Sequence, residues 1–399
     1  MSKRSLNVLF IPMDGTGHVN ACLGIAEQLI ESGHKVSFLM NNQWRGKLSA
    51  KYGITEITHE SVSGRQTGGD PALEWALVFQ ESGMISSNGS LEKMLAWYTK
   101  LLPLFMKYSD VINERIESTI ESLKPDVIFM DQVICLPAVE RAGIPWVWIC
   151  SFNPLFLIDD ERTPPKGSGL PVNAKNEWKA FRQVVIEKTY DMWKTFNDFI
   201  VGKGLPALDV CQYFHRSPYL NVYPFPQEVD YTDIRPIPDK HLQLDNLMRK
   251  DKGSAFYIPV PLLDKPGKLI YLGLGSMVSS DLANMKRLIA ILGKSRHRFI
   301  VSKGPLHDKY DLPDNMWGQQ SVPQIQVLPV VDLVVTHGGN NTVTESLYFG
   351  KPMIVLPVFA DQYDNAQRLH ELGSYLLRYT ASLCSNHYVW IQTVDTMYS

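Results

Sequence analysis

Short apolar runs alternate with glycine loops and amphipathic stretches at the start of the chain. Val8–Ile11 is typical of a buried strand, Asp14–Gly17 forms a glycine loop, and Ala21–Ser32 has the apolar spacing of a helix. Lys35–Met40 supplies a second strand. Because a helix separates the two strands, we expect them to lie parallel and to be joined by a right-handed crossover.

The same order of elements returns further along the chain. Pro125–Asp131 and Trp146–Cys150 read as strands on either side of a helix at Ala138–Gly143. Four more strands are expected in the last third, at Lys268–Gly273, Arg298–Val301, Asp332–Thr336 and Met353–Pro357. The pattern predicts an α/β protein with two doubly wound parallel sheets that face each other across a cleft.

A stretch rich in proline and charge separates the two sets of strands. Periodicity weakens from Pro224 to Pro266, so we place the domain boundary there, with residues 1–235 in an N-terminal domain and 236–399 in a C-terminal domain. Ligands of open parallel sheets collect at the carboxyl ends of the strands. The residues that follow each strand are therefore the candidates for a site.

Composition excludes several classes of function. The 399 residues carry a formal charge of -2, which gives no field to attract nucleic acid or an anionic membrane. No apolar run is long enough to span a bilayer, and we expect a cytoplasmic protein, most simply a monomer. The five cysteines show no C-x-x-C spacing and no metal motif is present, so buried free thiols are expected, and neither a metal nor another cofactor.

The densest group of chemically useful side chains runs from Val322 to Ala366. A strand ends at Thr336, and the glycines of Thr336–Gly339 precede a helix that begins near Asn341. The unpaired N–H groups and positive dipole end of such a helix form a site for a diphosphate. The side chains that can take part are His337, Asn341 and Thr342 as donors to phosphate, Glu345 as an acceptor for ribose hydroxyls, and Asp361 with Gln362 for a polyhydroxylated ligand.

This block closely resembles the signature of the UDP-glycosyltransferases, the inverting family 1 glycosyltransferases with the two-domain GT-B fold. The resemblance implies a UDP-sugar co-substrate, a hexose that is most simply glucose, and a small lipophilic or phenolic acceptor, as in the conjugation of foreign compounds. It assigns His337, Gly339, Asn341 and Thr342 to the pyrophosphate, Glu345 to the ribose, Asp361 and Gln362 to the sugar, Val322 and Gln324 to the uracil, and Ser276 and Ser302 to further donor contacts. Ser321 stands where plant members carry a stacking Trp.

A second group lies in the first domain, where His18 ends the opening glycine loop. Inverting transfer needs a base that removes the proton of the acceptor hydroxyl, and histidine titrates in the useful range. His18 matches the family's catalytic base. A carboxylate must orient that base, and Asp131 ends a neighbouring strand at the position that the family's His–Asp dyad uses. Asp126 lies at the other end of that strand. Asp14 is the local rival, but it is read more readily as a turn or cap residue.

The acceptor side and the end of the chain are less clearly marked. Trp75, Phe79, Met84, Trp97, Phe152 and the loop 164–169 can line an apolar pocket, although such aromatic residues can equally be core. The family pattern holds to Gly373 and then breaks, so we expect an atypical, shortened second domain that resembles soluble bacterial and arthropod members.

Two other functions are alternatives to glycosyl transfer. An NAD-dependent oxidoreductase needs a third glycine where Asn20 or Val278 stands, so its fingerprint is incomplete. A catalytically silent relative that binds nucleotide or a small lipophile without turnover is the alternative to the enzyme.

Overall fold

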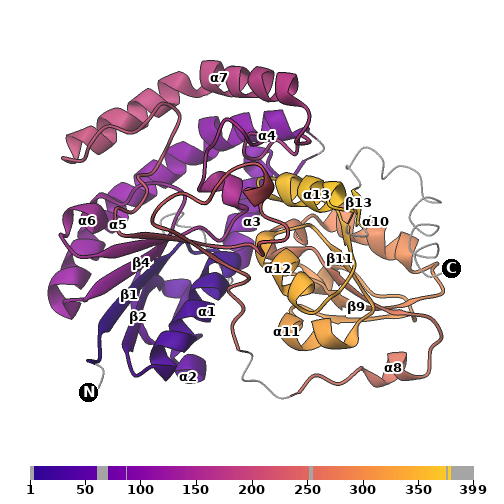
Figure 1. The fold of residues 1–399 in the computed structure, drawn as a ribbon. Helices are drawn as coiled ribbons and strands as arrows, with labels where there is room; N and C mark the ends of the chain where they lie inside the picture. Colours follow the sequence, from indigo (N-terminus) through magenta and orange to yellow (C-terminus); the bar gives the residue numbers. More distant parts are fainter. Residues whose placement is uncertain (1–3, 61–70, 87, 251–254, 374–375, 379–399) are drawn as a thin grey trace.

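A computed structural model describes residues 4–60, 71–86, 88–250, 255–373 and 376–378, which form two α/β domains side by side (Figure 1). Every strand pairing in these residues is parallel. The two facing, doubly wound sheets expected from the sequence are therefore present.

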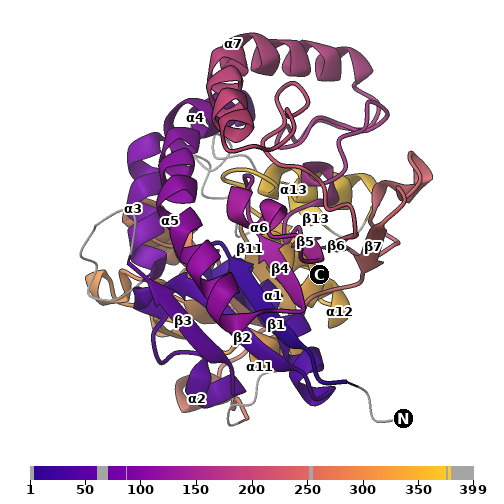
Figure 2. The ribbon, with the colours of Figure 1, turned by 90° about the vertical axis from the view of Figure 1, so that its left-hand side faces the viewer.

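The first sheet has the strand order β3-β2-β1-β4-β5-β6-β7 in the described residues. Its strands are β1 Asn7–Pro12, β2 Lys35–Asn41, β3 Thr55–His59, β4 Val127–Asp131, β5 Trp146–Ile149, β6 Leu220–Pro224 and β7 His241–Leu244. Its helices are α1 Thr16–Glu31, α2 Ser49–Tyr52, α3 Pro71–Ser82, α4 Ser90–Ala96, α5 Leu102–Leu123, α6 Pro137–Arg141 and α7 Lys175–Gly202. Figure 2 shows α7 above α4 and α5 at one end of this domain.

The second sheet has the order β10-β9-β8-β11-β12-β13 in the described residues. Its strands are β8 Leu269–Gly273, β9 Arg298–Ser302, β10 Met316–Gln319, β11 Leu333–Thr336, β12 Met353–Val355 and β13 Leu376–Arg378. Its helices are α8 Val260–Leu263, α9 Gly275–Val278, α10 Leu282–Leu292, α11 Gln324–Val327, α12 Asn340–Tyr348 and α13 Gln362–Glu371. Both sheets thus reverse direction at the same internal place, between β1 and β4 and between β8 and β11.

Continuous apolar runs explain why the central strands form. Residues 8–12 of β1 and all of β8 are buried, as expected for strands covered on both faces. Phe10 stacks between Phe38 and Phe129 of the neighbouring strands, with ring centroids 4.9 and 4.8 Å apart. This packing fixes the register of β1 against β2 and β4.

Two boundaries differ from those expected. Helix α1 begins at Thr16 rather than at Ala21, because Gly15 is its extended N-cap and Thr16 and Gly17, weak helix formers, open its first turn. The first sheet also extends past residue 235, since β7 pairs with β6, and the passage between the sheets follows Leu244. The proline and charged residues before β7 obscure its strand pattern in the sequence.

Helix α13 of the second domain is packed against the first domain, and its residues 362–369 are all buried. The carboxylate of Asp364 accepts the N–H groups of Gly167 (2.6 Å) and Gly169 (2.9 Å). Arg368 donates to the carbonyls of Val229 and Asp230 at 3.0 and 2.7 Å. The described residues therefore hold the two domains together through hydrogen bonds of α13.

The structure also bears on the cysteines, the end of the chain and membrane-spanning helices. Cys22, Cys135 and Cys150 are buried and Cys211 is partly buried, all as free thiols, whereas Cys384 lies outside the described residues. The shortened end expected after Gly373 also lies outside them, apart from β13. In the described part of the chain, no helix is both long enough and apolar enough to cross a membrane.

Candidate active site

His18 lies where the strand order of the first sheet reverses. It is the third residue of α1, which follows β1 through a short loop. Asp131 is the last residue of the adjacent strand β4 and stands opposite Pro12 in the register. Both side chains therefore reach the carboxyl edge of the sheet, where ligands collect in open parallel sheets.

The surroundings of His18 fix its imidazole. Nδ1 lies 2.9 Å from Oδ2 of Asp131, which is fully buried, and 3.1 Å from Oγ of Ser151. The ring of Phe152 meets the imidazole edge-on at 5.0 Å between centroids. A carboxylate on the Nδ1 side favours the tautomer with the proton on Nδ1, which leaves the lone pair on Nε2. Ser151 was missed in the sequence; its one signal is its place after an apolar strand.

The rival carboxylates are occupied elsewhere. Asp14 accepts the backbone N–H of Asn41 at 2.9 Å and so ties the loop after β1 to the end of β2. Asp126 binds Arg4 at 2.8 Å at the opposite end of β4. The structure therefore brings Asp131, and neither of these, to His18.

A cleft of about 570 Å³ lies between the domains, at the carboxyl ends of both sheets. His18 lines it from the first domain. Every donor-binding candidate lines it: Ser276, Ser302, Val322, Gln324, His337, Gly339, Asn341, Thr342, Glu345, Asp361 and Gln362. Ser321 lines it as well, so the position of the plant family's Trp faces the cleft.

His337 follows β11 and packs between two glycines. A Cβ atom at Gly275 or Gly339 would lie 2.7 or 2.6 Å from atoms of its ring, closer than real contacts allow. Gly275 also has a φ of +70°, which a side chain rarely adopts. Burial lowers the pKa of His337 to about 4, so at neutral pH the ring is uncharged and carries one N–H.

The N-terminus of α12 opens into the same cleft. Its N-cap is Gly339, whose lack of a side chain leaves the first N–H groups uncapped. The side-chain nitrogen of Asn341 donates to the carbonyl of Gly17 at 2.8 Å, across the cleft. Two features thus converge here: a positive helix end and a direct link between the domains.

A chain of polar contacts crosses the floor of the cleft. The hydroxyl of Tyr271 donates to Oε1 of Gln324 at 3.0 Å, and the amide of Gln324 donates to Glu345. Arg249 lies 3.5 Å from the same carboxylate. Burial raises the pKa of Glu345, against the attraction of Arg249. Arg249 was missed in the sequence because it lies in the proline-rich passage between the domains, where no motif marks it.

Asp361 and Gln362 line the same cleft as His18. Ala360, just before them, has a φ of +50°, a conformation that non-glycine residues adopt only when their surroundings hold them in it. The side-chain oxygen of Gln362 accepts the N–H groups of Val358 and Phe359, and Asp361 accepts that of Asn153 at 3.2 Å. Burial raises the pKa of Asp361 to about 7, with His18 and Asn153 opposing the shift.

A second, apolar cavity opens on the other side of His18. The aromatic and methionine side chains that line it include four of the five expected from the sequence, namely Phe79, Met84, Trp97 and Phe152, and also Trp148, Tyr213 and Phe214. Trp75, the fifth, lines the larger cleft instead. His18 lines both cavities and so stands where they meet.

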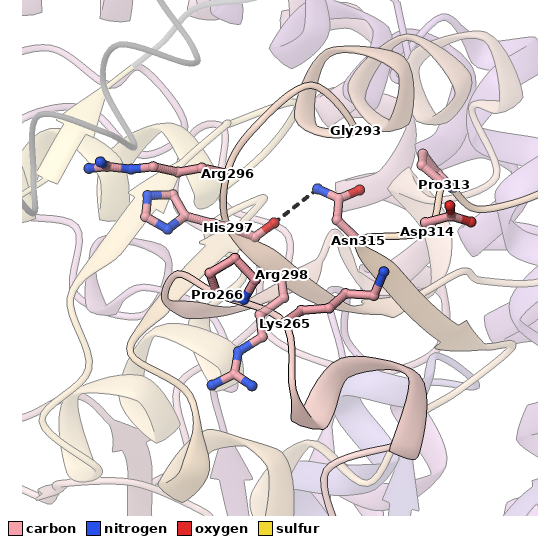
Figure 3. A pocket seen from close by; sticks show the side chains of 9 residues that line it. All are labelled: Lys265, Pro266, Gly293, Arg296, His297, Arg298, Pro313, Asp314 and Asn315. Carbon is pink, nitrogen blue, oxygen red and sulfur yellow. Dashed lines mark hydrogen bonds between the residues drawn. The ribbon is translucent and has the colours of Figure 1, made fainter.

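A third hollow, of about 460 Å³, lies at the opposite end of the second domain (Figure 3). Its polar groups hold the chain that enters this domain: Arg298 donates to the carbonyls of Leu262 and Leu263 at 2.7 and 3.0 Å. Asn315 donates to the carbonyl of His297 at 2.9 Å. This hollow lies at the amino end of β9, away from the cleft. Its hydrogen bonds hold the segment that connects the two domains.

Comparison with known proteins shows which family the chain resembles. Residues 266–388 match a family model described as "UDP-glucoronosyl and UDP-glucosyl transferase". The NDP-glycosyltransferase YjiC of Bacillus subtilis (strain 168) is 25% identical over 382 residues, which cover 94% of this chain and 84% of that protein. Both matches support a family 1 glycosyltransferase, and with it a transferase enzyme, as the resemblance implies.

Other relatives of this glycosyltransferase extend the comparison. The sterol 3-beta-glucosyltransferase of Saccharomyces cerevisiae (strain YJM789) is 23% identical over 90% of this chain, which spans 30% of that protein. Among solved structures, the glycotransferase of kitacinnamycin has a TM-score of 0.64 at 17% identity, with 99% of this chain and 91% of that chain covered. The spinosyn rhamnosyltransferase SpnG, complexed with thymidine diphosphate, has a TM-score of 0.63 at 18% identity, covering 98% and 91%. These likenesses confirm the GT-B fold.

Proposed function

We propose that this glycosyltransferase moves glucose from UDP-glucose to a hydroxyl of a small lipophilic acceptor, with inversion at the anomeric carbon. The observation that carries the proposal is the place of His18, at the junction of a polar cleft and an apolar cavity and beside a buried carboxylate. A donor in the cleft and an acceptor in the cavity meet at this imidazole. SpnG, complexed with thymidine diphosphate, supports a nucleoside diphosphate site on the same fold.

The proposed reaction is a single displacement. Nε2 of His18 takes the proton of the acceptor hydroxyl while the acceptor oxygen attacks the anomeric carbon. The bond between that carbon and the β-phosphate oxygen breaks on the opposite face, and its electron pair leaves with UDP. Asp131 stabilises the imidazolium that forms on His18, as a carboxylate on Nδ1 does in other His-based catalysts.

The leaving group is stabilised without a metal in this proposal. Negative charge develops on the β-phosphate near the N-terminus of α12, where uncapped N–H groups and the helix dipole favour it. Neutral His337 donates one N–H to the same phosphate. Glu345 accepts the ribose hydroxyls, Val322 and Gln324 adjoin the uracil, and Ser276 and Ser302 contact the phosphates and the sugar side.

Changing Gly339 to Ala tests the role of His337. A methyl group there displaces the imidazole, since it would lie 2.6 Å from Nε2. We expect UDP affinity to fall by about tenfold, the value of one hydrogen bond to a charged group. Calorimetric titration of UDP measures this loss. Gly202→Ala is the matched control, because nothing lies within 4 Å of a Cβ at that position; equal affinity in both variants contradicts the assignment.

The pKa of Asp361 near 7 predicts a pH-dependent affinity for UDP-glucose. Sugar hydroxyls donate to the ionised carboxylate, so a protonated Asp361 must first lose its proton, and affinity should rise with pH. Between pH 6 and pH 8 the ionised fraction rises about tenfold, and the affinity with it. Titrations of UDP-glucose at both pH values test this. The rise should be absent in Asp361→Asn, and a rise that persists there would assign it to another group.

A further inference from the structure

The apolar cavity beside His18 contains a lysine. Lys166 lines it together with Cys150, Tyr213 and Phe214. The lysine is partly exposed by surface area because it faces this cavity. An amine at the wall of a largely apolar pocket is expensive to desolvate unless something in the pocket pairs with it.

The contacts within the protein do not satisfy this ammonium group. Within the described part of the chain, Lys166 makes a long hydrogen bond, 3.4 Å to Oε1 of Gln212, an uncharged acceptor. The carboxylate of Asp159 attracts it from a distance, but that carboxylate is exposed and accepts the amide of Gln212 at 2.5 Å. Burial lowers the pKa of Lys166, with Asp159 opposing. An ammonium group has three donors, so donors remain for a ligand.

The backbone around Lys166 is held rigidly. Gly167 has a φ of +73°, and a Cβ there would lie 2.3 Å from Sδ of Met94. The carboxylate of Asp364 accepts the N–H groups of Gly167 and Gly169 from the other domain. The lysine is therefore set in place by the same contacts that join the domains, rather than carried on a free loop.

We infer that Lys166 selects acceptors that carry a carboxylate in addition to the hydroxyl that receives the sugar. This inference rests on the proposed function, since it places that hydroxyl at His18 and the carboxylate at Lys166, which line the same cavity. The aromatic walls suit a flat ring between the two groups. A hydroxylated aromatic acid fits this description, whereas a neutral sterol, the acceptor in the name of the yeast relatives, leaves the ammonium group unpaired.

The test compares two acceptors that differ only in charge, para-hydroxycinnamate and its methyl ester. A charge-assisted hydrogen bond in a pocket favours the acid by about tenfold or more in kcat/KM with UDP-glucose. Lys166→Met should lower kcat/KM for the acid by a similar factor and leave the ester within about twofold. Lys179→Met, at an exposed lysine of α7, is the matched control and should keep the preference. A wild-type enzyme that prefers the ester, or a preference that survives Lys166→Met, overturns the inference.

Further readouts separate this inference from the proposed function. UDP affinity checks that Lys166→Met is folded, and Lys166→Gln replaces it if it is not. Quenching of tryptophan fluorescence, from Trp97 and Trp148 in the cavity, measures acceptor binding to the UDP-saturated protein. Tighter binding of the acid without transfer supports Lys166 but contradicts the proposed function. Transfer to both acceptors at equal rates supports the proposed function but contradicts the role of Lys166. Failure of both acceptors to bind contradicts both proposals.

Discussion

His18→Ala is expected to lower transfer to an acceptor by about 10²–10⁴-fold, the usual contribution of a general base. The variant removes Nε2, the proposed acceptor of the hydroxyl proton, from the junction of the cleft and the apolar cavity. Affinity for UDP should stay within about twofold, because the proposed diphosphate site, at α12 and His337, is in the other domain. Initial rates of UDP release and a UDP titration of the same preparation measure the two effects.

The exposed His370→Ala serves as the control and should retain wild-type rates. Equal losses of transfer and of UDP affinity in His18→Ala would mean that His18 positions the domain or the donor rather than acting as the base.

Asp131→Asn should lower transfer by about 10²–10³-fold. Asp131 is fully buried and 2.9 Å from Nδ1 of His18, and in the proposed reaction its charge both selects the tautomer and stabilises the imidazolium. An amide of the same size removes the charge and keeps the packing. Because the carboxylate acts through the imidazole, Asp131→Asn in a His18→Ala background should cost almost nothing further, and a double-mutant cycle of kcat/KM tests this.

Asp126→Asn is the matched control, since it changes the same residue type at the other end of the same strand. It should affect stability alone, through the contacts with Arg4 and with the N–H of Asn7. Additive losses from His18→Ala and Asp131→Asn would show that Asp131 works independently of the imidazole.

The residues at strand ends were predictable because the signal for a buried parallel strand is local. Apolar runs such as Val8–Ile11 and Asp332–Thr336 locate the strands. The reversal of strand order then brings His18 and Asp131 to the carboxyl edge of the first sheet and His337 to that of the second. The convergence of the donor candidates on a single cleft follows from the same rule.

Other features depend on contacts that no local pattern encodes. Arg249 reaches Glu345 from the connection between the domains, and Ser151 reaches Nδ1 of His18 from the end of β5. The start of α1 was misplaced because Thr16 and Gly17 have low helix propensity, and Gly15 begins the helix without a side-chain cap. The carboxylates of Asp364 and Glu371 in α13 likewise accept backbone N–H groups across the domain interface, which a single sequence does not reveal.

The anomeric configuration of the product tests the proposed single displacement most directly. We would mix EDTA-treated protein with UDP-glucose, whose sugar is α-linked, and a small phenol, and follow the anomeric proton by NMR. A single displacement at His18 predicts a β-glucoside formed together with an equal amount of UDP and without added metal. An α-glucoside would contradict the single displacement at His18. UDP binding with no glycoside from a panel of phenols would instead indicate the silent relative, which keeps the donor site and lacks turnover.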